Sequence, residues 1–222
     1  MNKKLKILTS IFVAAILIAI GISLYLHLGI KTILIICSTM FALFSPIFYV
    51  LSILKGESKP HRTTRFVLLI ITLLSFASLL AQHNTVAIFL AWVSALQSIL
   101  IFSLCIKYGM GWWAKTDIIC LVIAGIGILV WKLTNNPVMW LLASILADFV
   151  GFLPALIKTY KFPETETWIF YALDVFAGLF TLLAVSNFTY QETTYPIYIL
   201  GINFVMFIFI IRPEISKRLA RA

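Results

Sequence analysis

Charged side chains are scarce in this sequence: Asp, Glu, Lys and Arg together make up 11% of its 222 residues. A soluble domain carries roughly 25%, because its surface has to be solvated. Hydrophobic residues make up 62%, and the mean hydropathy is +1.07. Only lipid can cover that much apolar surface. The composition therefore excludes a soluble catalytic domain and predicts a single all-α membrane domain.

The motifs of soluble enzymes are also missing. The sequence has no phosphate-cradling glycine loop, no His-Glu metal spacing and no Ser-His-Asp set. The three histidines, His27, His61 and His83, stand alone near predicted helix ends, where we expect exposed positions. The three cysteines lack metal-ligand spacing and form no redox motif; they are Cys37, Cys105 and Cys120. We therefore expect no enzyme, no metal and no cofactor.

Eight apolar stretches account for nearly the whole chain, each close to the ~20 residues that a helix needs to cross the hydrocarbon core. The first follows Lys3 and Lys4, a pattern that secretory signal peptides share. We favour a retained helix, because the run from Leu5 to Leu28 is long and no A-x-A-like cleavage site follows it. Cleavage would leave seven helices. The predicted spans are residues 7–27, 32–54, 66–81, 86–107, 115–132, 137–158, 167–186 and 195–211.

The basic residues predict the orientation. With the amino end inside, only Lys31 and Lys132 of the 17 Lys and Arg residues fall outside, as the positive-inside rule requires. The net charge of +9 then reflects the membrane topology and does not indicate a nucleic-acid partner. The alternative role for the basic residues of the 55–65 loop is to bind anionic lipid headgroups. The carboxyl end is expected in the cytoplasm, and the membrane is expected to be the bacterial cytoplasmic membrane.

A weak internal repeat organises the chain at an offset of 103 residues, the difference between matching positions such as Lys55 and Lys158. It predicts five parts: an N-terminal helix (1–31), a first three-helix repeat (32–107), a linker helix (108–134), a second repeat (135–211) and a basic tail (212–222). The linker helix makes the two triplets parallel, an arrangement that secondary transporters use with the substrate at the repeat interface. The other matches are Pro60 with Pro163, Thr64 with Thr167, and residues 78–81 with residues 181–184.

The two loops carry a resemblance. The stretch from Leu153 to Lys161, followed by Pro163, Glu164 and Glu166, resembles a PQ-loop motif, with Ala155 where that motif has glutamine. The first repeat offers a looser version in Pro46, Tyr49, Lys55, Lys59, Pro60 and Thr63. The triplet–linker–triplet plan resembles the SWEET sugar transporters and the PQ-loop and nicotinamide riboside transporters, and more closely a group of bacterial membrane proteins of unassigned function. The resemblance implies a 3+1+3 bundle, here with one extra helix.

Two acids lie well inside predicted spans. Asp148 and Asp174 are each roughly 10–15 Å from the cytoplasmic end of their helix, at ~1.5 Å per residue. Buried acids at such depth normally face the bundle interior or a wet cavity. If they face each other, one holds its proton near neutral pH, which suits proton coupling or capture of a cation. The alternative is a protonated structural acid in each position.

Amides, aromatics and prolines complete the predicted site. Gln97 and Asn203 are mid-span in the third helix of each repeat and offer donors and acceptors to a polar solute; the SWEET family resembles this in placing Asn there. The alternative is interhelical hydrogen bonding. Pro46 and Pro154 are candidate hinges or static kinks. The candidate residues for stacking on a flat or sugar-like ligand are Trp92, Trp140, Trp168 and Tyr171. The alternative is that these rings only pack within the protein or face lipid.

These features predict a transporter of a small polar metabolite, such as a sugar, vitamin or amino acid. It would work by alternating access between the two repeats, with proton coupling as an option. Its partners would be the small-molecule substrate and the lipid bilayer, and it could act as a monomer or homodimer. The competing hypothesis is a non-transporting membrane scaffold, sensor or assembly partner, which would bury the same residues in closed pairs.

Overall fold

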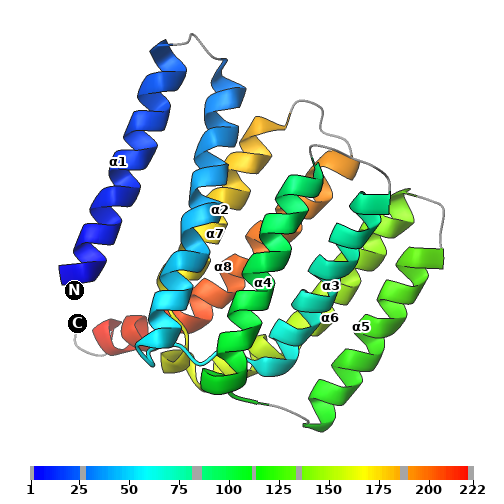
Figure 1. Cartoon of the computed structure of the whole chain (residues 1–222). Helices are drawn as coiled ribbons and strands as arrows, with labels where there is room; N and C mark the ends of the chain where they lie inside the picture. Colours follow the sequence, from blue (N-terminus) through cyan, green and yellow to red (C-terminus); the bar gives the residue numbers. More distant parts are fainter. Residues whose placement is uncertain are drawn as a thin grey trace. The chain divides into compact units, whose positions relative to one another are not determined.

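The computed structural model describes residues 3–25, 29–81, 87–111, 114–133, 137–185 and 190–219. Within these ranges the chain forms eight α-helices and one short 3-10 helix, η1 (Pro163–Thr165) (Figure 1). The prediction of an all-α chain of eight helices is confirmed for the described residues. The helices are α1 (Lys3–Tyr25), α2 (Ile30–Leu54), α3 (Arg62–Ala81), α4 (Ala87–Tyr108), α5 (Lys115–Leu133), α6 (Pro137–Lys161), α7 (Trp168–Ala184) and α8 (Tyr190–Leu219).

Helix ends follow local chemistry. Helix α2 stops before Gly56. The φ of Gly56 is 76°, a left-handed conformation that glycine adopts without steric cost. Helix α5 begins after Ala114, whose amide donates to the Asp117 carboxylate at 3.3 Å. Helix α3 starts four residues before the predicted span at 66, and α8 continues to Leu219. The first eight residues of the basic tail are therefore helical.

Two helical segments are long and apolar enough to cross a membrane by length and composition: Ile30–Leu54 and Thr193–Ser216. Shorter apolar helical segments are Ser10–Gly21, Ala95–Tyr108 and Trp168–Ala184. The other predicted spans and the 3+1+3 arrangement therefore stay predictions.

The chain divides into two compact units. Unit 1 comprises residues 1–48 and 169–205. Its core joins α1, α2 and α7 through Phe12, Phe48 and Leu173. The ring of Phe12 lies 5.2 Å from that of Phe41, and Phe41 stacks on Phe180 of α7 at 5.5 Å. Aromatic packing thus joins the consecutive helices α1 and α2 to α7, which is far from them in the sequence.

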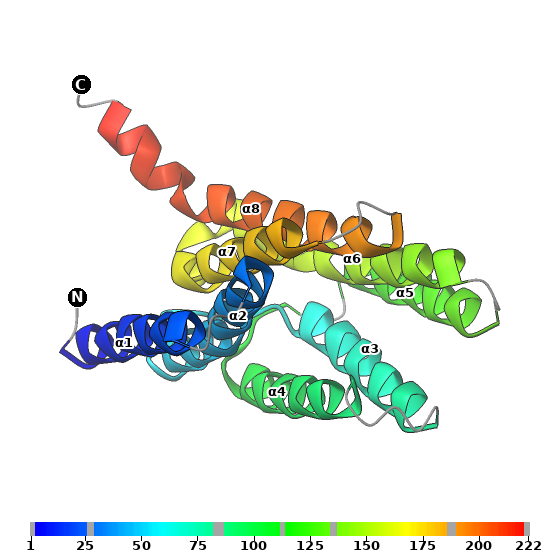
Figure 2. The same ribbon diagram turned by 90° about the horizontal axis from the view of Figure 1, so that it is seen from above.

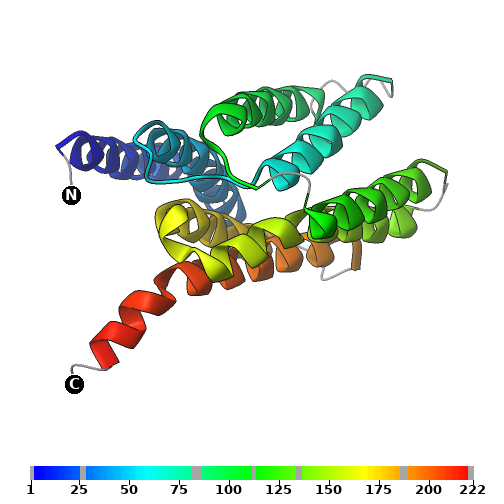
Figure 3. The ribbon, with the colours of Figure 1, turned by 90° about the horizontal axis from the view of Figure 1, so that it is seen from below.

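Unit 2 comprises residues 49–168 and 206–222. Helix α5 lies along α6 and α3 lies along α4, as Figures 2 and 3 both show. Helix α3 also packs on α6, where Val67 and Ala147 form a buried core. A side chain at Gly151 would clash with Val67, because its Cβ would stand 2.4 Å from a Val67 methyl group. Glycine at this position therefore permits the close approach of α3 and α6.

Candidate functional site

The two loops that match at the 103-residue offset lie against each other inside unit 2. The Lys59 amide donates to the Thr165 carbonyl at 2.8 Å. In return, Lys158 Nζ donates to the Lys59 carbonyl at 2.7 Å and to the Thr165 carbonyl at 3.2 Å. The loop after α2 and the loop after α6 therefore meet at one end of the unit.

A buried ion pair forms the centre of this contact. Lys158 Nζ lies 2.6 Å from Glu166 Oε1, and the two side chains are 4% and 1% exposed. The Tyr49 hydroxyl also donates to Oε1, at 3.4 Å. The Arg65 guanidinium lies 4.6 Å from the centre of the Tyr49 ring. Tyr49 of α2 and Arg65 of α3 flank the first loop. Both thus lie around a charge pair whose members, Lys158 and Glu166, flank the second loop.

The two repeats contribute unequally. Lys55 matches Lys158 in the sequence, yet Lys55 is exposed while Lys158 is buried. The position that matches Glu166 is Thr63, which is also buried but neutral. At these matching positions, the second repeat therefore has a buried charge pair where the first repeat has the exposed Lys55 and the neutral Thr63.

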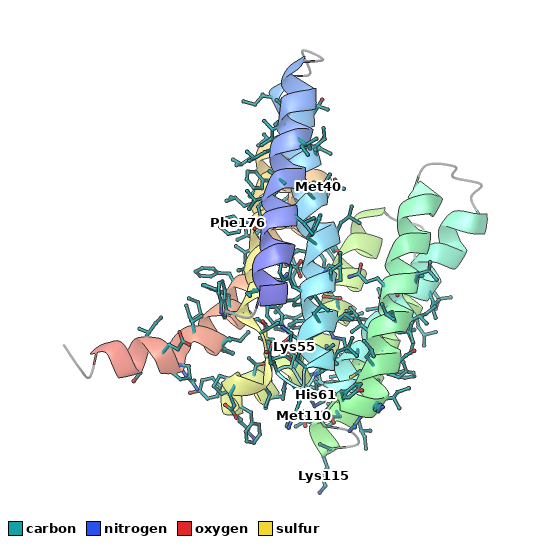
Figure 4. The ribbon with its side chains drawn as sticks, turned by 60° about the vertical axis from the view of Figure 1, so that its left-hand side comes forward. Met40, Lys55, His61, Met110, Lys115 and Phe176 are labelled. Atoms are coloured by element: carbon teal, nitrogen blue, oxygen red, sulfur yellow. The ribbon has the colours of Figure 1, made fainter. Side chains whose placement is uncertain are left out.

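His61 and Asp117 form a second polar contact at this end of unit 2. His61 Nε2 lies 3.7 Å from Asp117 Oδ1, with 7% and 3% of the two side chains exposed. The expected exposed position of His61 is therefore wrong, because Gly111 (φ 71°) brings the backbone directly over the imidazole. Figure 4 shows His61 beside Met110, while Lys115 projects away. Burial lowers the pKa of His61, and the Asp117 carboxylate opposes that shift.

The predicted hinge at Pro154 has a side-chain partner in α3. Proline has no N–H, so the α6 hydrogen-bond ladder loses the donor that would reach the residue 150 carbonyl. The next amide, that of Ala155, donates to Thr64 Oγ1 at 3.2 Å. Both Thr64 and Pro154 are buried. The hydroxyl from the neighbouring helix thus supports the interrupted segment, and a hinge role for Pro154 stays a prediction.

In unit 1, hydroxyl groups bridge α2 and α7. Ser45 donates to the Phe170 carbonyl at 3.3 Å, and Ser38 donates to the Ala177 carbonyl at 2.9 Å. The Ser38 and Thr181 hydroxyls are 2.6 Å apart. A hollow of about 280 Å³ opens here; its lining residues are Ile35, Ser38, Thr39, Thr181, Ala184 and Val185.

Three predicted site residues belong to unit 1. Tyr171 is 1% exposed and meets the Phe170 ring edge-on at 4.8 Å. Asn203 is 7% exposed, and its Nδ2 donates to the Ile199 carbonyl at 2.9 Å. Asp174 is half-buried on α7. The candidate hinge Pro46 lies in the same unit, within α2.

The other predicted residues belong to unit 2. Asp148 on α6 and Gln97 on α4 are half-buried. Trp168 is 51% exposed, and its ring lies 6.3 Å from that of Phe207. The side chains of Trp92 and Trp140 lie outside the described residues. The predicted facing of Asp148 with Asp174, and of Gln97 with Asn203, joins residues of different units and stays a prediction.

Comparison with known proteins adds no assignment: the chain matches no protein-family model, no curated protein and no solved structure.

Proposed function

We propose that this chain is a multi-pass protein of the bacterial cytoplasmic membrane that moves a small polar metabolite by alternating access between two parallel three-helix repeats. Sugars, vitamins and amino acids are the candidate solutes. The proposal takes α2–α4 and α6–α8 as the repeats, α5 as the linker and α1 as the extra helix. Either a monomer or a homodimer could carry out this cycle.

The contact between the two matching loops carries the proposal. Parallel triplets need both loops on the same side of the membrane, whereas inverted triplets would separate them by the full bilayer. The hydrogen bond from the Lys59 amide to the Thr165 carbonyl supports the parallel arrangement, because it brings the two loops together. The basic residues of these loops support a cytoplasmic position for both, and with it a cytoplasmic carboxyl end.

Exposed apolar side chains support the membrane location. Helix α5 presents a nearly continuous apolar surface, more than scattered hydrophobic residues on a soluble protein would give. Such a surface fits a helix in contact with acyl chains. The residues concerned, each at least 41% exposed, are Ile118, Ile119, Val122, Ile123, Ile126, Leu129 and Leu133.

Polar residues within the helices support transport. The proline in α2 and the proline in α6 each interrupt a helix that belongs to a different proposed repeat. Asp148, Asp174, Gln97 and Asn203 would supply binding and coupling groups near the membrane midplane. Trp168 and Tyr171, with Trp92 and Trp140, would offer stacking surfaces to a flat or sugar-like solute.

A stabilisation screen on the purified protein in detergent tests the proposal. Sugars, amino acids, nucleosides and vitamins are added to wild type, Asp148→Asn and Asp174→Asn at two pH values. A ligand that binds only the folded state stabilises it by ~2.7 kcal/mol at a hundredfold excess over its Kd. We expect one solute class to stabilise wild type, with a pH-dependent response that either substitution removes.

The second candidate function is a membrane scaffold, and the closed loop contact favours it. Lys158 and Glu166 are paired with each other, and Ser52 and Ser58 are hydrogen-bonded at 2.7 Å. A scaffold would respond to no solute in the screen. The only effect of Asp148→Asn and of Asp174→Asn would then be a loss of stability. That combined result would replace the transport proposal with the scaffold.

A further inference from the structure

The first half of α2 and the end of α7 meet through hydroxyl groups in unit 1. The Ser38 and Thr181 hydroxyl oxygens lie 2.6 Å apart, and each lies 2.9 Å from the Ala177 carbonyl oxygen. The two helices lie side by side (Figure 1). Helix α2 belongs to the first proposed repeat and α7 to the second, so this contact joins the two proposed repeats within one unit.

The hydrogens of these hydroxyls are committed within the protein. At 2.6 Å, one hydroxyl of the pair donates to the other, which in turn donates to the Ala177 carbonyl. Thr39, the next residue on α2, donates to the Ile35 carbonyl at 2.8 Å. A hydroxyl oxygen also carries two acceptor lone pairs. The three hydroxyls therefore offer acceptor oxygens to a molecule that approaches them.

The three hydroxyls line one hollow of about 280 Å³. This volume equals that of about nine water molecules at ~30 Å³ each. It lies near the lower end of the roughly 300–1,000 Å³ of small-molecule sites. Thr39 and Thr181 are exposed, so the hollow is open at the protein surface. Its size and opening therefore suit one small solute.

The lining of the hollow favours a neutral molecule. Within the part of the chain that the structure describes, no charged side chain lines it. An ammonium or carboxylate group would therefore enter without a compensating charge, which is costly. The remaining lining is apolar and comes from Ile35, Ala184 and Val185. These side chains suit the C–H groups of a molecule whose O–H or N–H groups face the hydroxyls.

We propose that this hollow binds one small neutral solute that donates O–H or N–H hydrogen bonds to the hydroxyl oxygens of Ser38, Thr39 and Thr181. Small polyols and primary amides share this chemistry. A donor that bonds to the first hydroxyl of the Ser38–Thr181 chain polarises the chain as a whole, and so strengthens the hydrogen bond at its Ala177 end.

The place of the hollow in the fold fits an entry site for the proposed transport cycle. At ~1.5 Å per residue, Thr39 lies roughly 14 Å from the start of α2 at Ile30. Thr181 and Ala184 lie in the last turn of α7. In the proposed topology both of these helix ends face the outside, and the hollow lies where secondary transporters hold their substrates, between repeats. The inference rests on the proposed function for this role and on the geometry of unit 1 for the binding.

Thermal unfolding of the purified full chain in detergent tests the site with four solutes. Erythritol supplies O–H donors and propionamide supplies N–H donors. N,N-dimethylpropionamide keeps the amide carbonyl without an N–H, and glycine is a zwitterion. We expect a saturable rise in unfolding temperature with erythritol or propionamide, which tells whether O–H or N–H groups fit, and none with the other two. A rise that only grows linearly with concentration is the general effect of an excluded osmolyte and would contradict the site.

Three variants separate the hydroxyl, the hollow and the general effect of a substitution. Thr181→Val removes one acceptor with little change of shape and should weaken the apparent affinity about tenfold, equivalent to ~1.4 kcal/mol; Thr181→Ser should bind as wild type. Ala184→Leu leaves the three hydroxyls in place and fills the hollow, so it should abolish the response. Thr72→Val is the matched control, because the Thr72 hydroxyl bonds within its own helix at the Leu68 carbonyl. It should respond as wild type.

The site would be overturned by the absence of a saturable response in wild type, or by an undiminished response in Thr181→Val or Ala184→Leu. An equal response to N,N-dimethylpropionamide or glycine would also overturn it. A solute that stabilises wild type and both variants alike would remove this site and leave transport standing. A response confined to this site, with Gln97→Cys and Asn203→Cys protected from thiol reagents on both faces of the membrane, would keep the site and remove transport.

Discussion

Lys158 Nζ and Glu166 Oε1 are 2.6 Å apart in a contact from which solvent is almost fully excluded. The same ammonium group holds the Lys59 carbonyl of the other loop at 2.7 Å. The pair therefore joins a residue near the end of α6 to both loops, and its loss would leave one buried charge without compensation.

Replacement of Lys158 by Met tests this contact. Breaking a buried ion pair leaves the remaining charge unpaired, so we expect unfolding in mixed detergent micelles to become easier by about 3 kcal/mol or more. Lys55→Met is the matched control, because Lys55 occupies the equivalent repeat position and is exposed. It should change the unfolding free energy by less than about 0.5 kcal/mol. Equal effects would contradict the assigned role of the pair.

The Thr64 hydroxyl should matter because Pro154 interrupts α6. Thr64→Val removes the acceptor of the Ala155 amide and should cost about 1–3 kcal/mol of unfolding free energy. Pro154→Ala restores a donor to the helix and lets α6 reform its own ladder, so Thr64→Val should cost less in that background. A double-mutant cycle measures this coupling. Strict additivity of the two substitutions would show that Thr64 does not support the proline break.

Two glycines with positive φ offer a comparison of strain with steric clash. Gly56→Ala has open space around the new methyl group. It should therefore lower the unfolding free energy only by the strain of alanine in the left-handed conformation, about 1–2 kcal/mol. Gly111→Ala carries the same term, and its methyl carbon would also stand 2.2 Å from His61 Nε2. We expect a clearly larger loss of thermal stability for Gly111→Ala. A loss no greater than that of Gly56→Ala would mean that His61 moves aside.

The pH dependence of stability should report on His61. Its pKa is lowered from the ordinary value of 6.5, chiefly by burial. The unfolded chain therefore takes up the proton first, and folding stability falls as the pH drops below 6.5 until the folded-state pKa is passed. His61→Gln should flatten this part of the profile in thermal unfolding measured across acidic pH. An unchanged slope in the variant would rule out His61 as its source.

Periodicity and hydropathy predict most of the secondary structure. Each of the eight apolar runs lies mainly within one helix in the described residues, because a long apolar run is a signal that the local sequence carries. The start of α3 at Arg62 was missed, since Arg62, Thr63 and Thr64 carry no apolar signal. Arg62 joins the helix while its side chain donates to the Cys105 and Ile106 carbonyls at the end of α4.

The polar end of unit 2 was harder to predict. The sequence marks Lys158 as a charge that sets the topology, because it does not show that Glu166, which follows η1, pairs with Lys158. The recurrence of Lys and Pro at one offset in two loops was the available signal that these loops meet. His61 was missed for a similar reason: its burial depends on Gly111 and Asp117, about 50 residues away along the chain.

The central claim is that water reaches a polar cavity between two moving repeats, and cysteine accessibility tests it most directly. Gln97→Cys and Asn203→Cys, each in a chain without its native cysteines, are labelled with a membrane-impermeant thiol reagent from either face of oriented vesicles. Ile99→Cys, at an exposed apolar position roughly 160° around α4 from Gln97, is the lipid-facing control and should stay protected. The account predicts labelling of both test positions, with the accessible side shifting when a stabilising solute is added. Complete protection of both from both faces would contradict it.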